Sequence, residues 1–518
     1  MSSLVALSFM AMLQQAAPCE SLRTLSLPNT TITTAALVPA GPFTQPAPGG
    51  PPGGPVAPAP GAGQGGRGGG RGGGGGAPAA PAIRLPAHCR VAAVLTPSAD
   101  SHIEMEVWLP AENWNGKFQA VGNGGWAGTI SYAAMATPLQ EGYATASNDT
   151  GHKGGNALFA IDHPEKVIDF AYRAVHEMTV QSKAIINRFY NRPARLSYWN
   201  GCSTGGRQGL MAAQKYPEDF DAIVAGAPAN YQTHLHAWDL SVSVPIAKNP
   251  GSALPAPKLQ LLNSAVVNAC DALDGVRDGL LNDPRSCKFD VGTLQCKGAD
   301  GDSCLTAAQV ETARRIYAPA RTSSGAVVFP GKAPGSEVGW APNQTVSQLP
   351  AGSFMVAYNN AKWDPMTFDL DRDLKVVDEK VGTIINAVNP DLRAFKARGG
   401  KVLMYHGWND TAISPGNAID YYTSVLKTMG GRQEDFIRLY MAPGMNHCGG
   451  GVGPNQVNWM GALERWRESN TAPDRIDAYR VANNRVDMTR PLCPYPQVAV
   501  YKGVGSTNDA ENFACKAP

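Results

Sequence analysis

The stretch that decides the fold of this chain is YWNGCSTGGR, residues 198–207. It holds the pattern Gly-x-Ser-x-Gly around Ser203, after a β-like run at 195–199 and before a helix-like run at 208–216. In a nucleophile elbow a strand delivers the serine into a sharp, strained turn, and the two glycines let strand and helix approach closely. The pattern also arises by chance in glycine-rich chains, but its position between a strand and a helix indicates that Ser203 is a nucleophile.

The partners that such a serine needs follow later in the chain. Asp410 lies just past a predicted buried strand at 401–407, and His447 lies in the loop after a second predicted strand at 436–441. Serine, aspartate and histidine occur in this order in the α/β-hydrolase triad, where the histidine takes the serine proton and the aspartate holds the imidazole in the productive tautomer. We therefore predict Ser203, Asp410 and His447 as catalytic residues.

Both partners have alternative interpretations. Asp410 is also typical of a turn, because Asn-Asp before Ser-Pro is good turn chemistry. His447 could be a structural loop histidine, and His406 is the main rival base. His406 lies within the predicted strand rather than past its end, and loops carry catalytic residues more often, which favours His447.

An oxyanion hole requires two backbone N–H groups directed at the substrate oxygen. One is expected from Thr204, the residue after the nucleophile, and the other from the glycine-rich loop at 122–128. Within that loop Gly125 is our first choice and Gly124 the close alternative. The two glycines could also form only a tight turn.

Strands alternate with helices in the sequence from about residue 85. This alternation predicts an α/β fold with a mostly parallel sheet covered by helices on both faces. The rhythm breaks between about 230 and 394, where Cys, Pro, Gly and aromatic residues are frequent. We interpret this segment as a lid domain inserted into the hydrolase core. A separate binding domain is less natural, because the two parts of the triad must meet around the segment. The β-like runs lie at 91–95, 103–109, 118–121, 143–147 and 222–225, and a long amphipathic helix is predicted at 170–189.

Composition agrees with an exported protein. Residues 4–12 are apolar but too short to span a bilayer, as in a secretory signal, although no Lys or Arg precedes them. The 10 cysteines include no Cys-x-x-Cys, which favours disulfides over zinc and implies the periplasm or the outside of the cell. No later segment is predicted to cross a membrane.

Nucleic-acid binding is not expected. The low-complexity segment 39–82 contains an Arg-Gly run at 65–72, but arginines without interleaved aromatics make a poor platform for bases. The formal net charge of +2 gives no reason to expect a polyanionic partner. We predict a flexible linker instead. The expected organisation is a signal segment (1–18), an N-terminal segment tied to the core (19–38), the linker (39–82), the first half of the catalytic core (83–229), the lid (230–395) and the second half of the core (396–518).

Two cysteines flank the predicted catalytic residues: Cys202 directly precedes Ser203, and Cys448 directly follows His447. If Ser203 and His447 lie within hydrogen-bond reach, these neighbours are close enough for disulfide geometry. The Cys-Ser, Asp, His-Cys arrangement resembles the tannase and feruloyl esterase family, which also contains mono(2-hydroxyethyl) terephthalate hydrolases. The resemblance extends from about Cys89 to the C-terminus, and the other stretches that carry it are 122–128, 200–207, 216–228, 406–410, 443–449 and 490–496.

The resemblance implies a secreted serine esterase with an α/β-hydrolase core, a large inserted lid and no organic cofactor. Its substrate would be a small-molecule ester of an aromatic acid, feruloyl (hydroxycinnamoyl) or galloyl, derived from plant cell walls or tannins. The resemblance also implies a set of disulfides: Cys202–Cys448, Cys19–Cys89, Cys270–Cys287, Cys296–Cys304 and Cys493–Cys515.

The sequence leaves the acyl group open. Trp340, with other lid aromatics, and Ile413, three residues past the acid, are expected to line a flat apolar pocket. In the terephthalate monoester hydrolases a lid arginine binds the free carboxylate, but 322–370 contains no arginine. Lys332 or Lys362 could substitute, although an ammonium does not reproduce bidentate recognition. A serine amidase or peptidase on the same fold is the rival enzyme class.

An acidic loop in the lid predicts a cation site. Asp271, Asp274 and Asp278 are close in sequence, with two glycines among them. Clustered carboxylates repel one another unless a cation joins them, and oxygen-only ligation suits Ca²⁺. The spacing is not that of an EF-hand, and a solvated Asp-Gly turn region is the alternative. The family resemblance implies a structural Ca²⁺ held by these three side chains and by the carbonyls of Val276 and Leu280.

Overall fold

The computed structural model describes residues 16–43 and 83–517. Nearly all of the expected signal segment and of the expected linker lies outside the described residues. Within the described ranges, no helix is both long and apolar enough to cross a membrane.

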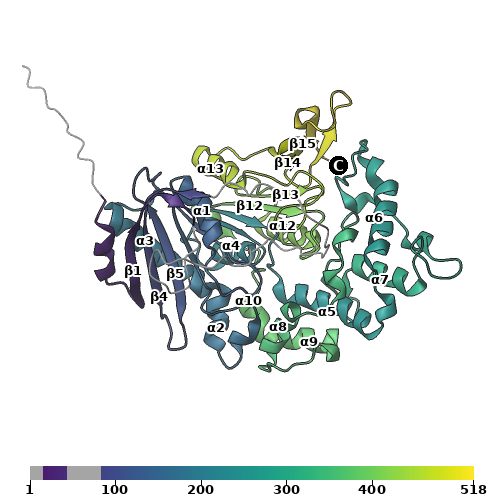
Figure 1. Ribbon diagram of the computed structural model, residues 1–518, viewed down its shortest axis with the longest axis horizontal. Coiled ribbons are helices and arrows are strands. Elements are labelled where there is room, and N and C mark those ends of the chain that lie inside the picture. The colour runs from purple at the N-terminus through teal and green to yellow at the C-terminus, as the bar shows by residue number, and fades with distance from the viewer. Residues whose placement is uncertain (1–15, 44–82, 518) are drawn as a thin grey trace, which may run out of the picture.

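A nine-stranded sheet forms the centre of the molecule (Figure 1). Its strand order is β1-β4-β5-β7-β6-β8-β9-β12-β13. From β7 to β13 neighbouring strands run parallel, whereas β1, β4, β5 and β7 pair in antiparallel fashion. The predicted mostly parallel sheet is therefore confirmed, with an antiparallel extension. The strands are β1 (Thr30–Val38), β4 (His88–Leu95), β5 (Ile103–Pro110), β6 (Lys117–Val121), β7 (Ala144–Asn148), β8 (Leu196–Cys202), β9 (Ala222–Gly226), β12 (Lys401–Gly407) and β13 (Ile437–Ala442).

Burial differs between the two parts of the sheet. Strands β9 and β12 are buried at every residue, as parallel strands are when helices cover both faces. Strand β1, at the edge, has only two buried positions, Ile32 and Ala35, and its other residues are at least partly exposed. It pairs with β4. The disulfide Cys19–Cys89 also joins the turn before β1 to strand β4.

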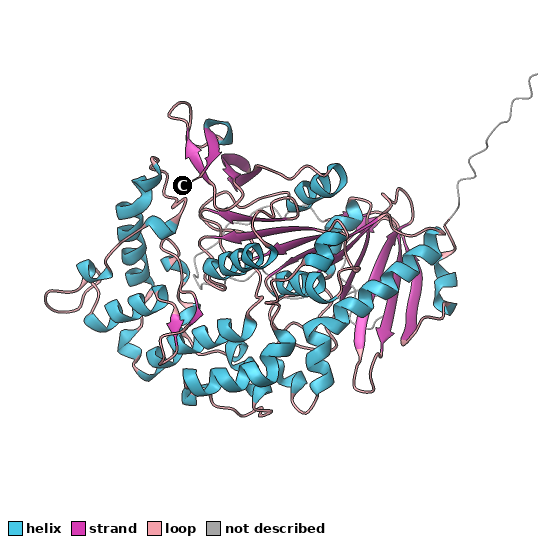
Figure 2. Cartoon of the chain, turned by 180° about the vertical axis from the view of Figure 1, so that it is seen from behind, coloured by secondary structure: helices cyan, strands magenta, loops and turns pink. Residues whose placement is uncertain are grey.

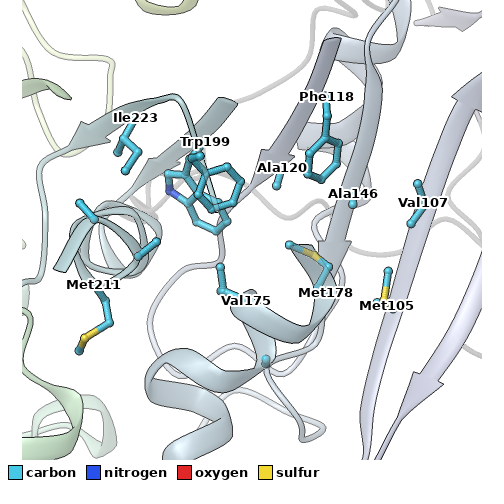
Figure 3. Close-up of a cluster of buried hydrophobic side chains, with 14 of the residues drawn as sticks. Met105, Val107, Phe118, Ala120, Ala146, Val175, Met178, Trp199, Met211 and Ile223 are labelled. Atoms are coloured by element: carbon cyan, nitrogen blue, oxygen red, sulfur yellow. The ribbon is translucent and has the colours of Figure 1, made fainter. Parts of the chain in front are cut away.

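Helices cover both faces of the sheet because alternate residues of a strand point to opposite sides. Trp199 of β8 packs with Ile223, Met178 and Met211 on one face (Figure 3). Its neighbour Tyr198 belongs to the cluster on the other face. The first face is covered by α3 (Ala174–Tyr190), α4 (Thr204–Lys215) and α12 (Pro415–Met429), and the second by α1 (Tyr132–Gln140) and α13 (Trp459–Ser469).

The helix after the elbow begins earlier than the predicted run at 208–216. Helix α4 begins at Thr204, directly after Ser203, despite three glycines in its first half. Tight packing requires two of them: a Cβ on Gly206 would lie 2.5 Å from the Gly226 oxygen, and a Cβ on Gly209 would lie 2.6 Å from the Trp199 ring. Close contact with the sheet thus outweighs the low helix propensity of glycine.

The segment expected to form the lid is mostly helical (Figure 2). Its buried residues form a second hydrophobic cluster, to which residues between 126 and 171 of the first half of the core also contribute. Two disulfides, Cys270–Cys287 and Cys296–Cys304, close the stretch between α6 and α7, which has little regular structure. The principal helices are α5 (Gln232–Lys248), α6 (Ala256–Cys270), α7 (Ala307–Tyr317), α8 (Gln348–Ala357) and α9 (Leu370–Val377).

The chain ends in two small antiparallel sheets, and the disulfide Cys493–Cys515 joins the residue after the first sheet to the last strand of the second. Together with the bridges above and Cys202–Cys448, this confirms the disulfide set that the family resemblance implied. The strands are β14 (Ile476–Ala482), β15 (Arg485–Leu492), β16 (Val498–Tyr501) and β17 (Phe513–Lys516).

Candidate active site

Ser203 sits in a strained turn between β8 and α4. Its φ of 63° and ψ of −123° lie outside the regions that L-residues ordinarily adopt. The turn is held because Ser203 N–H donates to the Gly226 carbonyl over 3.0 Å. A Cβ on Gly201 would lie 2.4 Å from the Gly205 oxygen, so only glycine permits this close approach. The geometry is that of a nucleophile elbow.

Asp410 and His447 come together at the ends of neighbouring strands. Asp410 follows β12, His447 follows β13, and His447 Nδ1 lies 2.7 Å from Asp410 Oδ2. The other carboxylate oxygen, Oδ1, accepts the N–H groups of Ala412 (2.8 Å) and Ile413 (2.9 Å). Because the side chain of Asp410 is fully buried, these bonds define its position.

The pKa of Asp410 follows from these contacts. Burial acts to raise it, but the interactions with His447 and His406 outweigh burial and hold the pKa well below its ordinary value. The carboxylate therefore stays ionised at neutral pH. An ionised acid at Nδ1 leaves the Nε2 atom of His447 as the proton acceptor.

His406, the rival candidate for the base, contacts the same carboxylate of Asp410. Its Nε2 is 3.0 Å from Asp410 Oδ2 and 3.1 Å from the Ile413 carbonyl, both of which are acceptors, so Nε2 carries a proton. The His406 side chain is fully buried, whereas that of His447 is 26% exposed. His447 is thus the histidine that can meet a substrate. His406 supports the acid, a contact that the sequence analysis did not predict.

A disulfide joins the elbow to the loop of the histidine. Cys202 and Cys448 are bonded, with 5.9 Å between their Cα atoms and a separation of 246 positions in sequence. The bridge places the residues next to Ser203 and His447 side by side, although the whole lid lies between them in the chain. It therefore brings Ser203, from the first half of the core, near the loop of His447 in the second half, and His447 in turn contacts Asp410.

Thr204 and Gly125 also lie together. The Thr204 hydroxyl donates to the Gly125 carbonyl over 2.9 Å, and the Gly205 N–H donates to the Asn123 carbonyl over 2.8 Å. Thr204 is the first residue of α4, where helical N–H groups have no intrahelical acceptor. Gly124 lies in the same loop, and a Cβ there would meet open space. The two N–H donors predicted for the oxyanion thus belong to adjacent segments.

Asn123 is a supporting residue that the sequence analysis missed. Its backbone N–H donates to Gln208 Oε1 (3.1 Å), and Gln208 Nε2 donates to its Oδ1 (3.0 Å). Its Nδ2 donates to the carbonyls of Thr129 and Asn148, both over 2.9 Å. Asn123 thereby attaches the glycine-rich loop to the elbow helix. The signal available in the sequence was an asparagine between two glycines, Gly122 and Gly124.

The two predicted pocket residues, Trp340 of the lid and Ile413 of the loop after β12, are buried in one hydrophobic cluster. Trp340 is fully buried, donates through Nε1 to Ser336 Oγ (2.9 Å) and packs edge-on against Tyr317. Ile413 is 2% exposed, and its backbone binds both Asp410 and His406. In this structure neither side chain is exposed at the surface of a pocket. The sequence analysis missed that the backbone of Ile413 positions the acid.

The acidic loop gathers three carboxylates around its own backbone. Asp271, Asp274 and Asp278 accept the N–H groups of Gly279 (3.0 Å), Val276 (3.0 Å) and Leu280 (3.1 Å), respectively. Burial, with repulsion from Asp278 and Asp271, raises the pKa of Asp274 to about 6. Asp278 also pairs with the buried guanidinium of Arg490, which offsets part of the repulsion in the loop. Oxygen donors of this kind suit a hard cation. Among the described residues, however, the one group of three whose possible ligand atoms all lie within 4.8 Å of one another is Cys296, Asp300 and Cys304, and both of its sulfurs are in a disulfide.

Comparison with known proteins identifies the family. The model of the family "Tannase and feruloyl esterase" matches residues 89–516. A probable feruloyl esterase B-2 of Aspergillus terreus is 37% identical, over 82% of this chain and 86% of that protein. An uncharacterized esterase of Xanthomonas campestris is 35% identical, over 96% of this chain and 91% of that protein.

Solved structures agree with this result. The crystal structure of feruloyl esterase B from Aspergillus oryzae superposes with a TM-score of 0.86 at 30% identity, covering 96% of this chain and 99% of that one. Tannin acyl hydrolase from Aspergillus niger superposes with a TM-score of 0.74 at 20% identity, covering 95% and 92%, which shows the shared fold. The chain therefore belongs to the tannase and feruloyl esterase family and is a carboxylic ester hydrolase with an α/β-hydrolase fold.

Proposed function

We propose that this protein hydrolyses esters of aromatic carboxylic acids by two-step acyl transfer through Ser203, His447 and Asp410. The observation that carries the proposal is the 2.7 Å contact between His447 and Asp410, on a loop bonded by Cys448 to the residue before Ser203. A strained serine, a base held by a buried ionised acid and two adjacent N–H donors are the groups that acyl transfer requires.

In the first step the Ser203 hydroxyl attacks the ester carbonyl while His447 takes its proton. Asp410 stabilises the imidazolium, and the N–H groups of Thr204 and Gly125 hold the oxyanion. His447 then protonates the leaving alcohol, which gives an acyl-enzyme. In the second step His447 activates a water molecule, and the aromatic acid is released.

The acyl group is proposed to be feruloyl, another hydroxycinnamoyl or galloyl. Family members named feruloyl esterase and tannin acyl hydrolase share this fold, and the former are more than 30% identical to this chain. The absence of arginine from 322–370 argues against a terephthalate monoester, because bidentate recognition of its free carboxylate would be lost.

A structural Ca²⁺ in the acidic loop is part of the proposal. Asp271, Asp274 and Asp278 would hold it through side chains, and Val276 and Leu280 through carbonyls. The bound ion would neutralise carboxylates that otherwise repel one another, and so hold the loop between α6 and α7. Five disulfides also support a secreted or periplasmic location.

The test is hydrolysis of methyl ferulate, methyl gallate and mono(2-hydroxyethyl) terephthalate by the purified protein and by Ser203→Ala. We expect turnover of a hydroxylated aromatic ester, and a loss of roughly 10⁴-fold or more in the variant. Turnover that survives in Ser203→Ala would remove this serine from the mechanism. A protein that acts on none of the three esters, while a phosphonate probe still labels Ser203, would be a serine hydrolase with a different substrate.

A further inference from the structure

Two loops lie side by side at the carboxyl ends of β6 and β7. The glycine-rich loop 122–128 follows β6, and the loop 149–154 follows β7, which pairs with β6 in parallel. The Gly128 N–H donates to the Gly154 carbonyl over 2.6 Å, and the Thr150 hydroxyl donates to the Ala127 carbonyl over 3.2 Å. The loop after β7 is therefore in a position to control the shape of the loop that carries Gly125.

His152 of the second loop contacts the backbone of the first. Its Nε2 lies 2.9 Å from the Trp126 carbonyl oxygen, and its Nδ1 lies 3.1 Å from the Thr150 hydroxyl. A carbonyl oxygen can only accept, so Nε2 carries a proton and donates this hydrogen bond. Burial lowers the pKa of His152, so at neutral pH the ring is neutral and its proton is the one on Nε2.

Packing fixes the orientation of this ring. His152 is 5% exposed, and its ring stacks on that of Phe159 with 3.6 Å between the centroids and 13° between the planes. The ring of Phe170 packs against it edge-on, 6.0 Å away. A Cβ on Gly128 would lie 2.4 Å from the His152 carbonyl oxygen, so only glycine lets the two loops approach this closely. The hydrogen bond from His152 to the oxyanion loop is thus held from several sides.

Two peptide groups connect this hydrogen bond to the Gly125 N–H. The Trp126 carbonyl and the Ala127 N–H belong to one peptide group, and the Ala127 N–H donates to the Gly124 carbonyl over 3.0 Å. The Gly124 carbonyl and the Gly125 N–H belong to a second peptide group. Both peptide bonds are trans, so in each the C=O and N–H bonds point in opposite directions. The hydrogen bonds therefore form one chain from His152 Nε2 to the Gly125 N–H.

The N–H at the end of this chain is available to a substrate. Among the described residues, none accepts a hydrogen bond from the Gly125 N–H. The φ of Gly125 is 54°, a value that the turn over 124–127 requires and that glycine adopts without strain. The carbonyl of Gly125 is held separately by the Thr204 hydroxyl. The direction of the N–H is thus set by the protein before any ligand binds.

We propose that His152 is a positioning residue for the oxyanion, and that it orients and polarises the Gly125 N–H through the two intervening peptide groups. This inference rests on the proposed function, in which Gly125 holds the oxyanion. In a chain of hydrogen bonds each bond polarises the next, so the donor at the end becomes stronger. Charge develops on the ester oxygen in the transition state, so a stronger donor there raises kcat more than it lowers KM.

The experiment compares His152→Phe, His152→Asn and His152→Gln with the parent protein on methyl ferulate. Phenylalanine keeps a stacked ring but has no donor, and the asparagine amide is too short to reach the Trp126 carbonyl. The Nε2 of glutamine can occupy the position of the histidine Nε2. The matched control is His176→Phe, because His176 also stacks on a ring, that of Tyr216 at 3.7 Å, and contacts Asp219 at 3.0 Å.

Three quantities are measured for each protein: kcat, KM and the rate at which a p-nitrophenyl phosphonate ester labels Ser203. During labelling the phosphoryl oxygen takes up charge as the ester oxygen does, so the rate reports on the oxyanion donors without depending on the acyl group. Thermal unfolding of each variant verifies the fold.

We expect kcat to fall about 10-fold in His152→Phe and His152→Asn, because losing an oxyanion donor outright costs about 10²- to 10³-fold and a misdirected donor costs less. KM should change little, and the labelling rate should fall by a similar factor to kcat. His152→Gln should recover most of both rates, and His176→Phe should match the parent protein. If His152→Phe does not fold, His152→Asn, which adds no volume, decides.

A kcat and a labelling rate that remain at the parent values in His152→Phe and His152→Asn would overturn the inference and leave hydrolysis through Ser203 intact. Equal losses in His152→Gln and His152→Phe would also overturn it, since they would show that only packing is involved. Failure of the proposed function gives a different result: the parent protein would not hydrolyse methyl ferulate, and the labelling rates would decide. A parent protein that is not labelled at Ser203 would overturn both.

Discussion

Asp410 and Asp239 are both carboxylates enclosed by the protein, but their surroundings differ. Asp410 receives two backbone N–H groups and two histidines, and its pKa lies well below the ordinary value. Asp239 makes no hydrogen bond to the described residues, and its pKa is raised to about 7. The first site is complete without substrate. The second, in the lid, has a carboxylate whose surroundings supply no hydrogen-bond donor among the described residues.

This difference separates two tasks of the enzyme. The sheet and its loops hold the reacting groups in place before substrate arrives, which lowers the cost of organising the transition state. The lid, in contrast, contains polar groups such as Asp239 that lack such partners among the described residues. Variants in the core should therefore change kcat, whereas variants in the lid should change substrate preference or stability.

The largest effect is expected for Asp410→Asn. The asparagine amide cannot stabilise the imidazolium or set its tautomer, so kcat should fall about 10⁴-fold with KM little changed. Steady-state kinetics on methyl ferulate measure this, with Asp302→Asn as the control in the lid. A loss of less than 10-fold would mean that the acid site is not the catalytic one.

His406 tests whether the acid site depends on its second histidine. His406→Leu removes a donor to Asp410 Oδ2 and should lower kcat by roughly 10- to 100-fold, because the lost hydrogen bond is to a charged group. His406→Gln can place an Nε2 donor at a similar position and should recover most of the activity. KM should change little in either variant. Equal losses in both variants would indicate that only packing is involved.

The disulfides allow a direct comparison of core and lid. Cys202→Ala/Cys448→Ala should lower kcat roughly 10-fold, since the elbow and the histidine loop would shift by a fraction of an ångström or more. Cys296→Ala/Cys304→Ala, within the lid, should lower Tm and leave kcat near that of the parent protein. Full activity in the first double variant would show that the bridge does not align the catalytic residues.

The smallest expected effect concerns the acidic loop. The raised pKa of Asp274 means that the folded protein holds this proton more tightly than the unfolded chain. The stability that Asp274 contributes is therefore present at low pH and is lost as the pH rises through about 6. Bound Ca²⁺ would compensate for the carboxylate charge, so chelation should lower Tm by a few degrees above this pH and less below it.

Scanning calorimetry with Ca²⁺ or with a chelator, from pH 5 to pH 8, checks this prediction. Asp274→Asn removes the titrating group and should flatten the pH dependence. A Tm that is identical with Ca²⁺ and with chelator at every pH, and no metal by elemental analysis, would leave the loop as a turn region.

The sequence predicted that Ser203, Asp410 and His447 converge, because their positions follow from a regular structure. In a parallel sheet the carboxyl ends of adjacent strands lie at one edge, so residues just past β8, β12 and β13 converge there. The cysteines beside Ser203 and His447 indicated the same arrangement, since a disulfide between them requires the two loops to be adjacent. Local patterns thus sufficed for Ser203, Asp410 and His447.

The sequence did not predict the supporting contacts. His406 was interpreted as a rival base, yet in the structure its Nε2 lies 3.0 Å from Asp410 Oδ2. Trp340 was expected in the pocket, yet it is fully buried in the lid core. Helix α4 begins at Thr204 because packing on the sheet outweighs glycine propensity.

By itself, then, the sequence determined the order of strands and helices, the residues that we propose as nucleophile, acid and base, and the family to which the chain belongs. These depend on periodicity and on motifs that span a few residues. Only the tertiary structure decided which polar side chains share a site. His236 and Ser353 lie 117 positions apart in the numbering, and neither belongs to a motif. Their 2.8 Å hydrogen bond arises from the packing of α5 against α8, and side-chain packing of that kind leaves no local pattern in the sequence.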